Sequence, residues 1–379
     1  MRIGIVTQSY YPRYGGVTEH VHHTAVELRS RGHEVTIITS HFRRGEPHQE
    51  QGVERIGHNV LIPFNGAFVD LAIGIRLGSQ LRRLYRKHRF DLVHVHAPSV
   101  PTLPVLAVRT APCAKVGTFH MTGNPDVWMN AAAGLVRRDI GKLDARIAVS
   151  STARDFSQLL FPGEYHVVPN GVDLDRFHPS VAPFAEWRDP GILNLLFVGR
   201  LDPRKGVHQL IAAFPEIVRL AKTRVRLLIV GDSYLRPQLE AAVAPAVREQ
   251  VHFLGHVPSE DLPRWYATGD LFVSPASGQE SFGIVLVEAM ASGRAVVASD
   301  IPGYRSVVNP GIDGVVTPPG DVAALARAVA ALADDPARRA TLARAGRARS
   351  LEFSWPRVTD QIEHVYGIAL ERAAQRGRP

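Results

Sequence analysis

Residues 278–303 read Gly-Gln-Glu-Ser-Phe-Gly-Ile-Val-Leu-Val-Glu-Ala-Met-Ala-Ser-Gly-Arg-Ala-Val-Val-Ala-Ser-Asp-Ile-Pro-Gly, the most informative stretch of this chain. It predicts a loop that opens a helix and then a strand, because an apolar run broken only by Glu288 begins at Phe282. Glu280 and Glu288 are eight residues apart, slightly more than two helical turns. The spacing therefore predicts both carboxylates on nearly the same face of a helix, where one ligand could meet both.

Outside this stretch, short apolar strands alternate with helical segments, which is the pattern of open parallel α/β sheets. A chain of 379 residues also exceeds the roughly 250–300 at which one core usually divides. We therefore expect an α/β fold of two Rossmann-like, doubly wound parallel-sheet domains. The expected strands lie at 2–7, 34–39, 91–95, 115–119, 145–149 and 165–168, and then at 193–199, 225–231, 251–254, 270–274 and 295–299.

A stretch rich in proline and turn formers, 170–191, separates the two series of strands and predicts an interdomain linker. The expected domains are 1–169 and 192–356. A cleft between two such domains is a common place for a ligand site.

The composition is that of an ordinary globular protein, with 45% hydrophobic and 21% charged residues. Cys113 is the single cysteine, so no internal disulfide can form. The N-terminus lacks a signal-peptide pattern, and no apolar run approaches the roughly 18 residues of a membrane span. We expect a cytoplasmic protein, or one that lies peripherally on the inner face of the membrane.

The net charge of +8 favours anionic partners without choosing among nucleotides, acidic lipids and nucleic acid.

An exposed helix N-terminus between two carboxylates suits a ligand that carries both phosphate and sugar. Free N–H groups and the positive end of the helix dipole attract phosphate, and carboxylates accept hydrogen bonds from sugar hydroxyls. A sugar nucleotide has both groups. The spacing alone leaves open a surface helix with two solvated glutamates.

Two further loops join strands to helices. Gly15 and Gly16 follow the first strand and precede an amphipathic helix that runs to Gly32; paired glycines let backbone approach a ligand, and Thr18 could cap that helix. Arg200 and Lys205 follow the strand at 193–199 and could stabilise the charge that develops on a departing diphosphate. An ordinary turn and a solvated basic loop are the respective alternatives.

Histidines gather at the ends of two predicted strands. His120 follows the strand at 115–119, while His94 and His96 project to one face of the preceding strand, because side chains alternate. A metal site would need more ligands, so we expect packing or hydrogen bonding at the end of the sheet.

A basic amphipathic stretch spans 73–89. Leu77, Leu81 and Leu84 form an apolar stripe, and Arg76, Arg83 and Lys87 share an adjacent face. Such a helix could dock on anionic lipid, although a helix packed on its own sheet would show the same stripe.

The segment 278–303 resembles the donor-binding segment of the family-4 retaining glycosyltransferases of the GT-B fold, with Glu280 and Glu288 at the two glutamates of that family's motif. The resemblance runs from Met1 to about residue 368 and is closest to the GDP-mannose-dependent phosphatidylinositol mannosyltransferases. The motifs that carry it are Gly15-Gly16-Val17, Pro63-Phe64-Asn65-Gly66, His94-Val95-His96, Thr118-Phe119-His120, Ile147-Ala148-Val149-Ser150, Pro169-Asn170-Gly171-Val172-Asp173 and residues 280–291.

The resemblance implies two domains that face each other across a cleft, with a C-terminal helix at 357–379 that crosses back to the first domain. It implies retaining transfer of a hexose, with mannose from GDP-mannose as the best match. The acceptor would be phosphatidylinositol or another lipid-linked, glycan or polyol molecule.

The resemblance also implies roles for particular residues. Glu280 would hold the hydroxyls of the transferred sugar, Glu288 the ribose, and Gly16 with Arg200 and Lys205 the diphosphate. The implied catalytic residues are His120, Glu280, Arg200 and Lys205; the implied donor-binding residues also include Gly15, Gly16, Gly231, Val257, Ser281, Phe282, Gly283, Ile284, Val285 and Glu288; and the implied acceptor-binding residues are Asn65 and His120.

No cofactor and no essential metal is expected. Asp173-Leu174-Asp175 matches the cation-binding pair of the other glycosyltransferase fold, GT-A, but it lies in the predicted linker, far from the phosphate loops. We interpret this pair as turn chemistry.

The sequence departs from the mannosyltransferases where the acceptor would bind. Asp70 stands where those enzymes have a basic residue, and Gly123-Asn124-Pro125 replaces a lysine-containing segment. Three alternatives therefore stay open: a family-4 enzyme that uses a UDP-sugar in polysaccharide or glycolipid synthesis, a GT-B nucleotide-sugar epimerase, and a noncatalytic nucleic-acid binder. The family-4 loop disfavours the epimerase. An aromatic content of 7%, without an RNA-recognition signature, disfavours the nucleic-acid binder.

Overall fold

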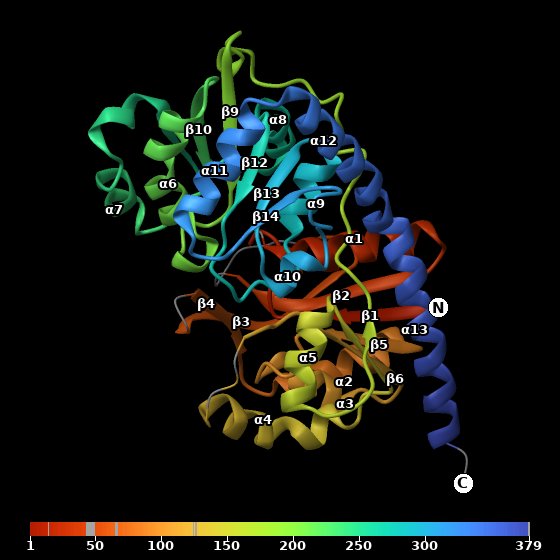
Figure 1. Ribbon diagram of the computed structural model, residues 1–379. Coiled ribbons are helices and arrows are strands. Elements are labelled where there is room, and N and C mark those ends of the chain that lie inside the picture. Colours follow the sequence, from red (N-terminus) through yellow and green to blue (C-terminus); the bar gives the residue numbers. More distant parts are fainter. Residues whose placement is uncertain (14, 43–49, 65–66, 124, 126, 378–379) are drawn as a thin grey trace. The chain divides into compact units, whose positions relative to one another are not determined.

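The computed structural model describes residues 1–13, 15–42, 50–64, 67–123, 125 and 127–377 (Figure 1). The chain divides into two compact units. Unit 1 comprises Met1–Gly171 and Trp355–Pro379, and unit 2 comprises Val172–Ser354. Each unit is built on an open, largely parallel sheet with helices on both faces, which confirms the predicted fold class.

Unit 1 has an eight-stranded sheet in the order β4-β3-β2-β1-β5-β6-β7-β8. Its described strands pair in parallel, except for the antiparallel pair β3–β4. That pair was not predicted, although Asn65-Gly66 is a sequence typical of tight hairpins. The strands are β1 (Arg2–Val6), β2 (Glu34–His41), β3 (Val53–Phe64), β4 (Ala67–Ile73), β5 (Leu92–His96), β6 (Ala114–Phe119), β7 (Ala145–Ala148) and β8 (His166–Val167).

Two layers of helices bury the faces of this sheet. On one face, α1 and the C-terminal helix α13, the blue helix of Figure 1, lie side by side and pack on strand residues such as Ile5 and Val116. On the other face, α2 to α5 pack on residues such as Val93 and Val95. The helices are α1 (Gly16–Ser30), α2 (Leu77–His88), α3 (Leu103–Thr110), α4 (Val127–Ile140), α5 (Ser151–Leu160) and α13 (Trp355–Arg376).

Two expectations for the helices of unit 1 were wrong. The N-cap of α1 is Gly15, and Thr18 is a buried residue inside the first turn, so Thr18 is not the cap. The helix in the basic stretch begins only at Leu77, because Ile73 ends β4 and Arg76 adopts a left-handed conformation with φ 61°. Arg76 therefore does not share a helical face with Arg83.

The leucine stripe of α2 is part of the core of unit 1. Leu77, Leu81 and Leu84 are buried against the sheet and α3, whereas Arg83 and Lys87 are exposed. Packing on its own sheet thus accounts for the apolar stripe. Within the described ranges, no helix is long and apolar enough to cross a membrane.

Unit 2 has a six-stranded sheet in the order β11-β10-β9-β12-β13-β14, and its described strands all pair in parallel. The short edge strand β14 was not predicted. The strands are β9 (Ile192–Val198), β10 (Arg224–Val230), β11 (Val251–Gly255), β12 (Leu271–Ser274), β13 (Ala295–Ser299) and β14 (Val315–Thr317).

Helices cover both faces of this sheet as well. One face packs against α6 and α11 and the other against α8, α9 and α10 (Figure 1). The α-helices are α6 (Val207–Leu220), α7 (Arg236–Ala241), α8 (Leu262–Thr268), α9 (Ile284–Ala291), α10 (Pro302–Arg305), α11 (Val322–Ala333) and α12 (Pro336–Ser350). Short 3₁₀ turns are η1 (Ala185–Trp187), η2 (Pro203–Lys205), η3 (Pro245–Gln250), η4 (Ser259–Asp261) and η5 (Leu351–Phe353).

Most of the segment 170–191, expected as a linker, belongs to unit 2. Phe177 is buried against Tyr266, and Phe184 packs on Trp265 with ring centroids 4.5 Å apart. These aromatic side chains attach the segment to the core. Unit 2 begins and ends at adjacent places, because Val172 N–H donates to the carbonyl of Phe353 at 2.8 Å and Val172 forms a parallel bridge with Ser354.

Candidate functional site

The loop before α9 differs from the expected geometry. The helix begins at Ile284, so Glu280 lies in the loop and only Glu288 lies on the helix. Gly283, with φ 96°, is the N-cap, and this left-handed residue interrupts the helical path. The prediction that one helical face carries both carboxylates is therefore wrong.

Two glycines let this loop approach neighbouring backbone closely. A Cβ on Gly206 would lie 1.8 Å from the carbonyl oxygen of Pro275, and a Cβ on Gly303 would lie 1.8 Å from that of Glu280. Any side chain at either position would displace the loop. The position of Glu280 is thus fixed by backbone packing on both sides.

Lys205 and Glu280 come together although they are 75 positions apart in the sequence. The ammonium Nζ of Lys205 lies 2.8 Å from Oε1 of Glu280, and the two side chains are only 20% and 14% exposed. Arg200, in the same loop as Lys205, is 56% exposed and lies 3.5 Å from the carboxylate of Asp202. Asp202 also accepts a hydrogen bond from the backbone N–H of Arg204, which fixes the start of η2.

Glu288 is held by a buried tyrosine that sequence reasoning missed. The hydroxyl of Tyr266 donates to Oε2 of Glu288 at 2.7 Å. Burial, together with the charge of Glu288, raises the pKa of Tyr266 well above its usual value, so the hydroxyl remains a donor. Tyr266 lies on α8 within an ordinary apolar segment, and no motif in the sequence marked it.

The remaining donor-binding candidates of unit 2 differ in which of their atoms a ligand could reach. Gly231 has φ 131°, and a Cβ there would lie 1.9 Å from the carbonyl oxygen of Gly199, so close approach of two strand ends requires glycine. Phe282 is buried in the core with its ring edge-on to Phe353, which leaves only its backbone for a ligand. Val257 is partly buried after β11. Ser281, Ile284 and Val285 are partly exposed around the start of α9.

In unit 1, Gly15 and Gly16 have no such structural requirement. A Cβ added to either would meet nothing within 4 Å, and the φ of Gly15, 170°, is extended backbone that any residue adopts. The fold therefore does not explain these glycines, whereas close approach of a ligand to the start of α1 would.

His120 belongs to a cluster of four histidines in unit 1. The rings of His94 and His96 lie 4.4 Å apart, and Nδ1 of His96 is 3.0 Å from Nε2 of His120. His20, which sequence reasoning missed, packs edge-on against His96 and His120 at 5.3 and 5.4 Å. His94 is also hydrogen-bonded to Thr118 and to the hydroxyl of Tyr366 on α13.

Burial keeps this histidine cluster neutral. It lowers the pKa of His20 to about 4 and that of His94 to about 3, and, together with neighbouring histidines, it lowers the pKa of His96 and His120 well below the usual range. Nε2 of His96 is buried and has no hydrogen-bond partner among the described residues. Because a buried N–H without an acceptor is unfavourable, we assign the proton of His96 to Nδ1, which then donates to Nε2 of His120. His120 therefore carries its own proton on Nδ1.

Three acceptor-side positions were singled out in the sequence: Asn65, Asp70 and Asn124. Asn65 and Asn124 lie outside the described residues, and the side chain of Asp70 is not described either.

The Asp173 carboxylate accepts hydrogen bonds from the backbone N–H groups of Asp175 and Arg176, which is the geometry of an Asx turn. Among the residues that the structure describes, no group of three or more His, Cys, Asp or Glu could hold a metal ion.

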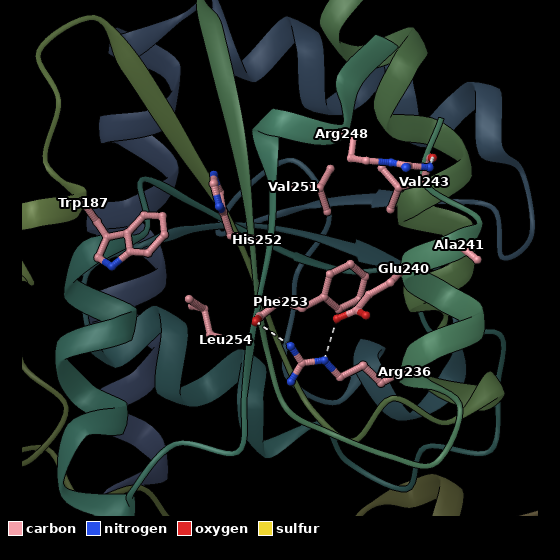
Figure 2. A pocket seen from close by; sticks show the side chains of 10 residues that line it. All are labelled: Trp187, Arg236, Glu240, Ala241, Val243, Arg248, Val251, His252, Phe253 and Leu254. Atoms are coloured by element: carbon pink, nitrogen blue, oxygen red, sulfur yellow. Dashed lines mark hydrogen bonds and ion pairs between the residues drawn. The ribbon is translucent and has the colours of Figure 1, made fainter. Parts of the chain in front are cut away.

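A pocket of about 670 Å³ beside the edge strand β11 does not contain the predicted donor residues. Figure 2 shows Arg236 bridging this pocket, where its guanidinium donates to Oε1 of Glu240 and to the carbonyl of Phe253. Trp187 and His252 lie on its other side. Arg236 and Glu240 satisfy each other there, and neither Lys205 nor Glu280 lines this pocket.

Comparisons with known proteins address both units. The family "Glycosyltransferase Family 4" matches residues 14–176, and "Glycosyl transferases group 1" matches residues 193–335. The chain is 35% identical over 373 residues to a phosphatidyl-myo-inositol mannosyltransferase of Mycolicibacterium smegmatis, covering 97% of this chain and 93% of that protein. It is 32% identical over 414 residues to a glycogen synthase of Mycobacterium tuberculosis, covering 100% of this chain and 97% of that protein.

Solved structures share the fold. A crystal structure of HepE from Anabaena in complex with UDP-glucose has a TM-score of 0.78 at 22% identity, covering 97% of this chain and 99% of that one. The sucrose-phosphate synthase of Thermosynechococcus elongatus has a TM-score of 0.75 at 21% identity, covering 97% and 98%. At these identities the likeness concerns the GT-B architecture alone.

Proposed function

Because this chain belongs to the group 1, family 4 glycosyltransferases, we propose that it transfers mannose from GDP-mannose, with retention, to the inositol ring of phosphatidylinositol. The observation that carries this proposal is the 35% identity to a phosphatidyl-myo-inositol mannosyltransferase across 97% of the chain. Another lipid-linked, glycan or polyol acceptor fits the same donor chemistry.

The ion pair between Lys205 and Glu280 supports the donor half of the proposal. A nucleotide diphosphate sugar brings an anionic diphosphate next to a set of hydroxyls. Lys205 would exchange the carboxylate for the diphosphate, and Glu280 would become free to accept hydrogen bonds from the sugar. Each residue thus holds the other in place until the ligand replaces both interactions.

The other predicted donor residues follow from the same binding mode. The exposed guanidinium of Arg200 would add a second cation for the diphosphate, and the backbone N–H groups at the start of α9 would bind its oxygens. Glu288, oriented by Tyr266, would accept a hydrogen bond from the ribose. Gly15 and Gly16 would let the donor approach the start of α1.

Retention needs no covalent intermediate in this scheme. The acceptor hydroxyl attacks from the face that the diphosphate leaves, and the departing phosphate oxygen takes the hydroxyl proton. Lys205 and Arg200 stabilise the charge that develops on the leaving group. His120, with its proton on Nδ1, would donate a hydrogen bond to the transferred sugar or the acceptor.

A lipid acceptor requires contact with a membrane surface, and α2 supports such contact. Arg82, Arg83, Arg86 and Lys87 are exposed on this helix. Each basic residue near an anionic bilayer contributes about 1 kcal/mol. We therefore propose peripheral association through this basic face, with the leucine stripe remaining in the core.

The glycogen synthase relative favours a second candidate, transfer of glucose from a UDP- or ADP-sugar. Thermal-shift measurements with GDP-mannose, UDP-glucose and ADP-glucose distinguish the donors, since a ligand at 100 times its Kd stabilises a protein by about 2.7 kcal/mol. We expect selective stabilisation by GDP-mannose, followed by transfer of labelled mannose to phosphatidylinositol. Selective stabilisation by a glucose nucleotide would replace the first candidate with the second.

A further inference from the structure

Unit 1 contains an apolar cavity of about 300 Å³ directly beside His120. It lies between the ends of β5 and β6 and the helices α4 and α5. Its walls are formed mainly by hydrocarbon side chains, among them Val100, Phe119, Met129, Phe156 and Leu160. A volume of this size is at the lower end of the roughly 300–1,000 Å³ of small-molecule sites.

The lining determines what kind of group can occupy the cavity. None of the described residues that line it is charged, and its polar side chains are those of His120, Ser99 and Ser157. A sugar or a phosphate placed there would lose hydrogen bonds to water without replacing them, which is unfavourable by several kcal/mol. The occupant must therefore be hydrocarbon, with any polar end next to His120.

The two helices that form the wall also carry exposed apolar side chains. Val127 and Leu135 on α4 are 82% and 83% exposed, and Leu159 on α5 is 66% exposed. A bilayer that contacts these helices would cover them and would supply a hydrocarbon chain beside the cavity.

We propose that this cavity binds one fatty-acyl chain of a phospholipid acceptor and so places the lipid's polar head at His120. The inference rests on the proposed glycosyl transfer, because that reaction puts the acceptor hydroxyl beside His120. The acyl chain accordingly contributes to acceptor affinity and leaves donor affinity unchanged.

A matched pair of variants on α4 tests the proposal. Ala132 lines the cavity at its exposed rim, whereas Ala131 is exposed and does not line it. With phosphatidylinositols below their micelle concentration, wild-type KM should fall about fourfold for each added acyl methylene that the cavity buries. Ala132→Phe should raise KM for the dioctanoyl lipid at least tenfold with GDP-mannose affinity unchanged, and Ala131→Phe should resemble the wild type. Equal KM values in the two variants, or no dependence on chain length, would overturn the proposal.

A binding assay separates this proposal from the proposed function. Parinaric acid, a fluorescent fatty acid, should bind the full chain, and dioctanoyl phosphatidylinositol should displace it, whereas inositol 1-phosphate should not. Ala132→Phe should weaken the fluorescent signal and Ala131→Phe should not. Displacement without mannosyl transfer would leave the cavity assignment standing and remove the proposed reaction. Failure of parinaric acid to bind would remove the cavity assignment itself.

Discussion

Acid should destabilise unit 1 because it contains buried neutral histidines. The pKa of His20 is lowered from 6.5 to about 4 and that of His94 to about 3. In the unfolded chain both side chains bind a proton near pH 6.5, whereas the folded chain does not bind these protons until the lower values are reached. Stability is therefore complete above pH 6.5, decreases as the pH falls below 6.5, and stops decreasing near the folded-state pKa values.

The size of this effect follows from the shifts. At pH 5 the pH lies about 1.5 units below the pKa of a histidine in the unfolded chain, and each unit favours the unfolded state by about 1.4 kcal/mol per histidine. Each side chain then contributes a loss of about 2 kcal/mol, and the two together about 4 kcal/mol. That loss is a large part of the roughly 5–15 kcal/mol by which a domain is stable.

The assay compares the free energy of unfolding of unit 1 at pH 7.5 and pH 5.0, with urea unfolding and hydrogen exchange of β5 and β6 peptides as readouts. His94→Gln removes one of the buried histidines that take up a proton on unfolding, so its loss between the two pH values should be about 2 kcal/mol smaller than that of the wild type. His208→Gln changes an exposed histidine of unit 2 and serves as the control. The reasoning is refuted if His94→Gln and the wild type lose the same stability on acidification.

Three further outcomes are expected. Gly16→Ala should leave the unfolding midpoint unchanged and weaken donor binding in calorimetry, because its Cβ meets nothing in the structure. Gly206→Ala should lower the free energy of unfolding by at least about 2 kcal/mol, because φ is 72° and the Cβ would overlap backbone. A loss of stability in Gly16→Ala but not in Gly206→Ala would contradict this distinction. Tyr266→Phe should lower the free energy of unfolding by about 1–3 kcal/mol, since it removes the hydroxyl that donates to Oε2 of Glu288, and an unchanged urea midpoint would count against that hydrogen bond. Turnover should persist after chelation with EDTA and fall about 100-fold in Lys205→Ala, so an EDTA-inactivated enzyme would mean that a metal, and not this cation, stabilises the leaving group.

The periodicity of apolar residues predicted most of the helices and strands. It failed where the backbone conformation of a single residue, or a direct strand-to-strand connection, departs from the pattern. The apolar run after Phe282 resembles a continuous helix, but Gly283 takes a left-handed conformation, and the helix begins one residue later. The β3–β4 hairpin was missed because its strands are joined directly, without the helix that the alternating pattern elsewhere leads one to expect.

The candidate site was predictable only in part. The family resemblance selected Lys205 and Glu280 separately, and their contact depends on a fold that brings two distant loops together. Tyr266 and His20 act through tertiary packing, so no local signal distinguishes them from core residues. The adjacent His22 and His23 in the same helix gave no means of selecting His20 from sequence.

Unit 2 starts and finishes side by side, through the bridge between Val172 and Ser354. A segment whose two ends are adjacent can be replaced without changing the distance between the flanking residues of the other unit. Each unit here also has its own hydrophobic cores. Recombination at its two junctions, which meet at this bridge, would exchange unit 2 as a whole and leave the sheet of unit 1 intact. Such an exchange needs no gradual remodelling of the unit that carries His120.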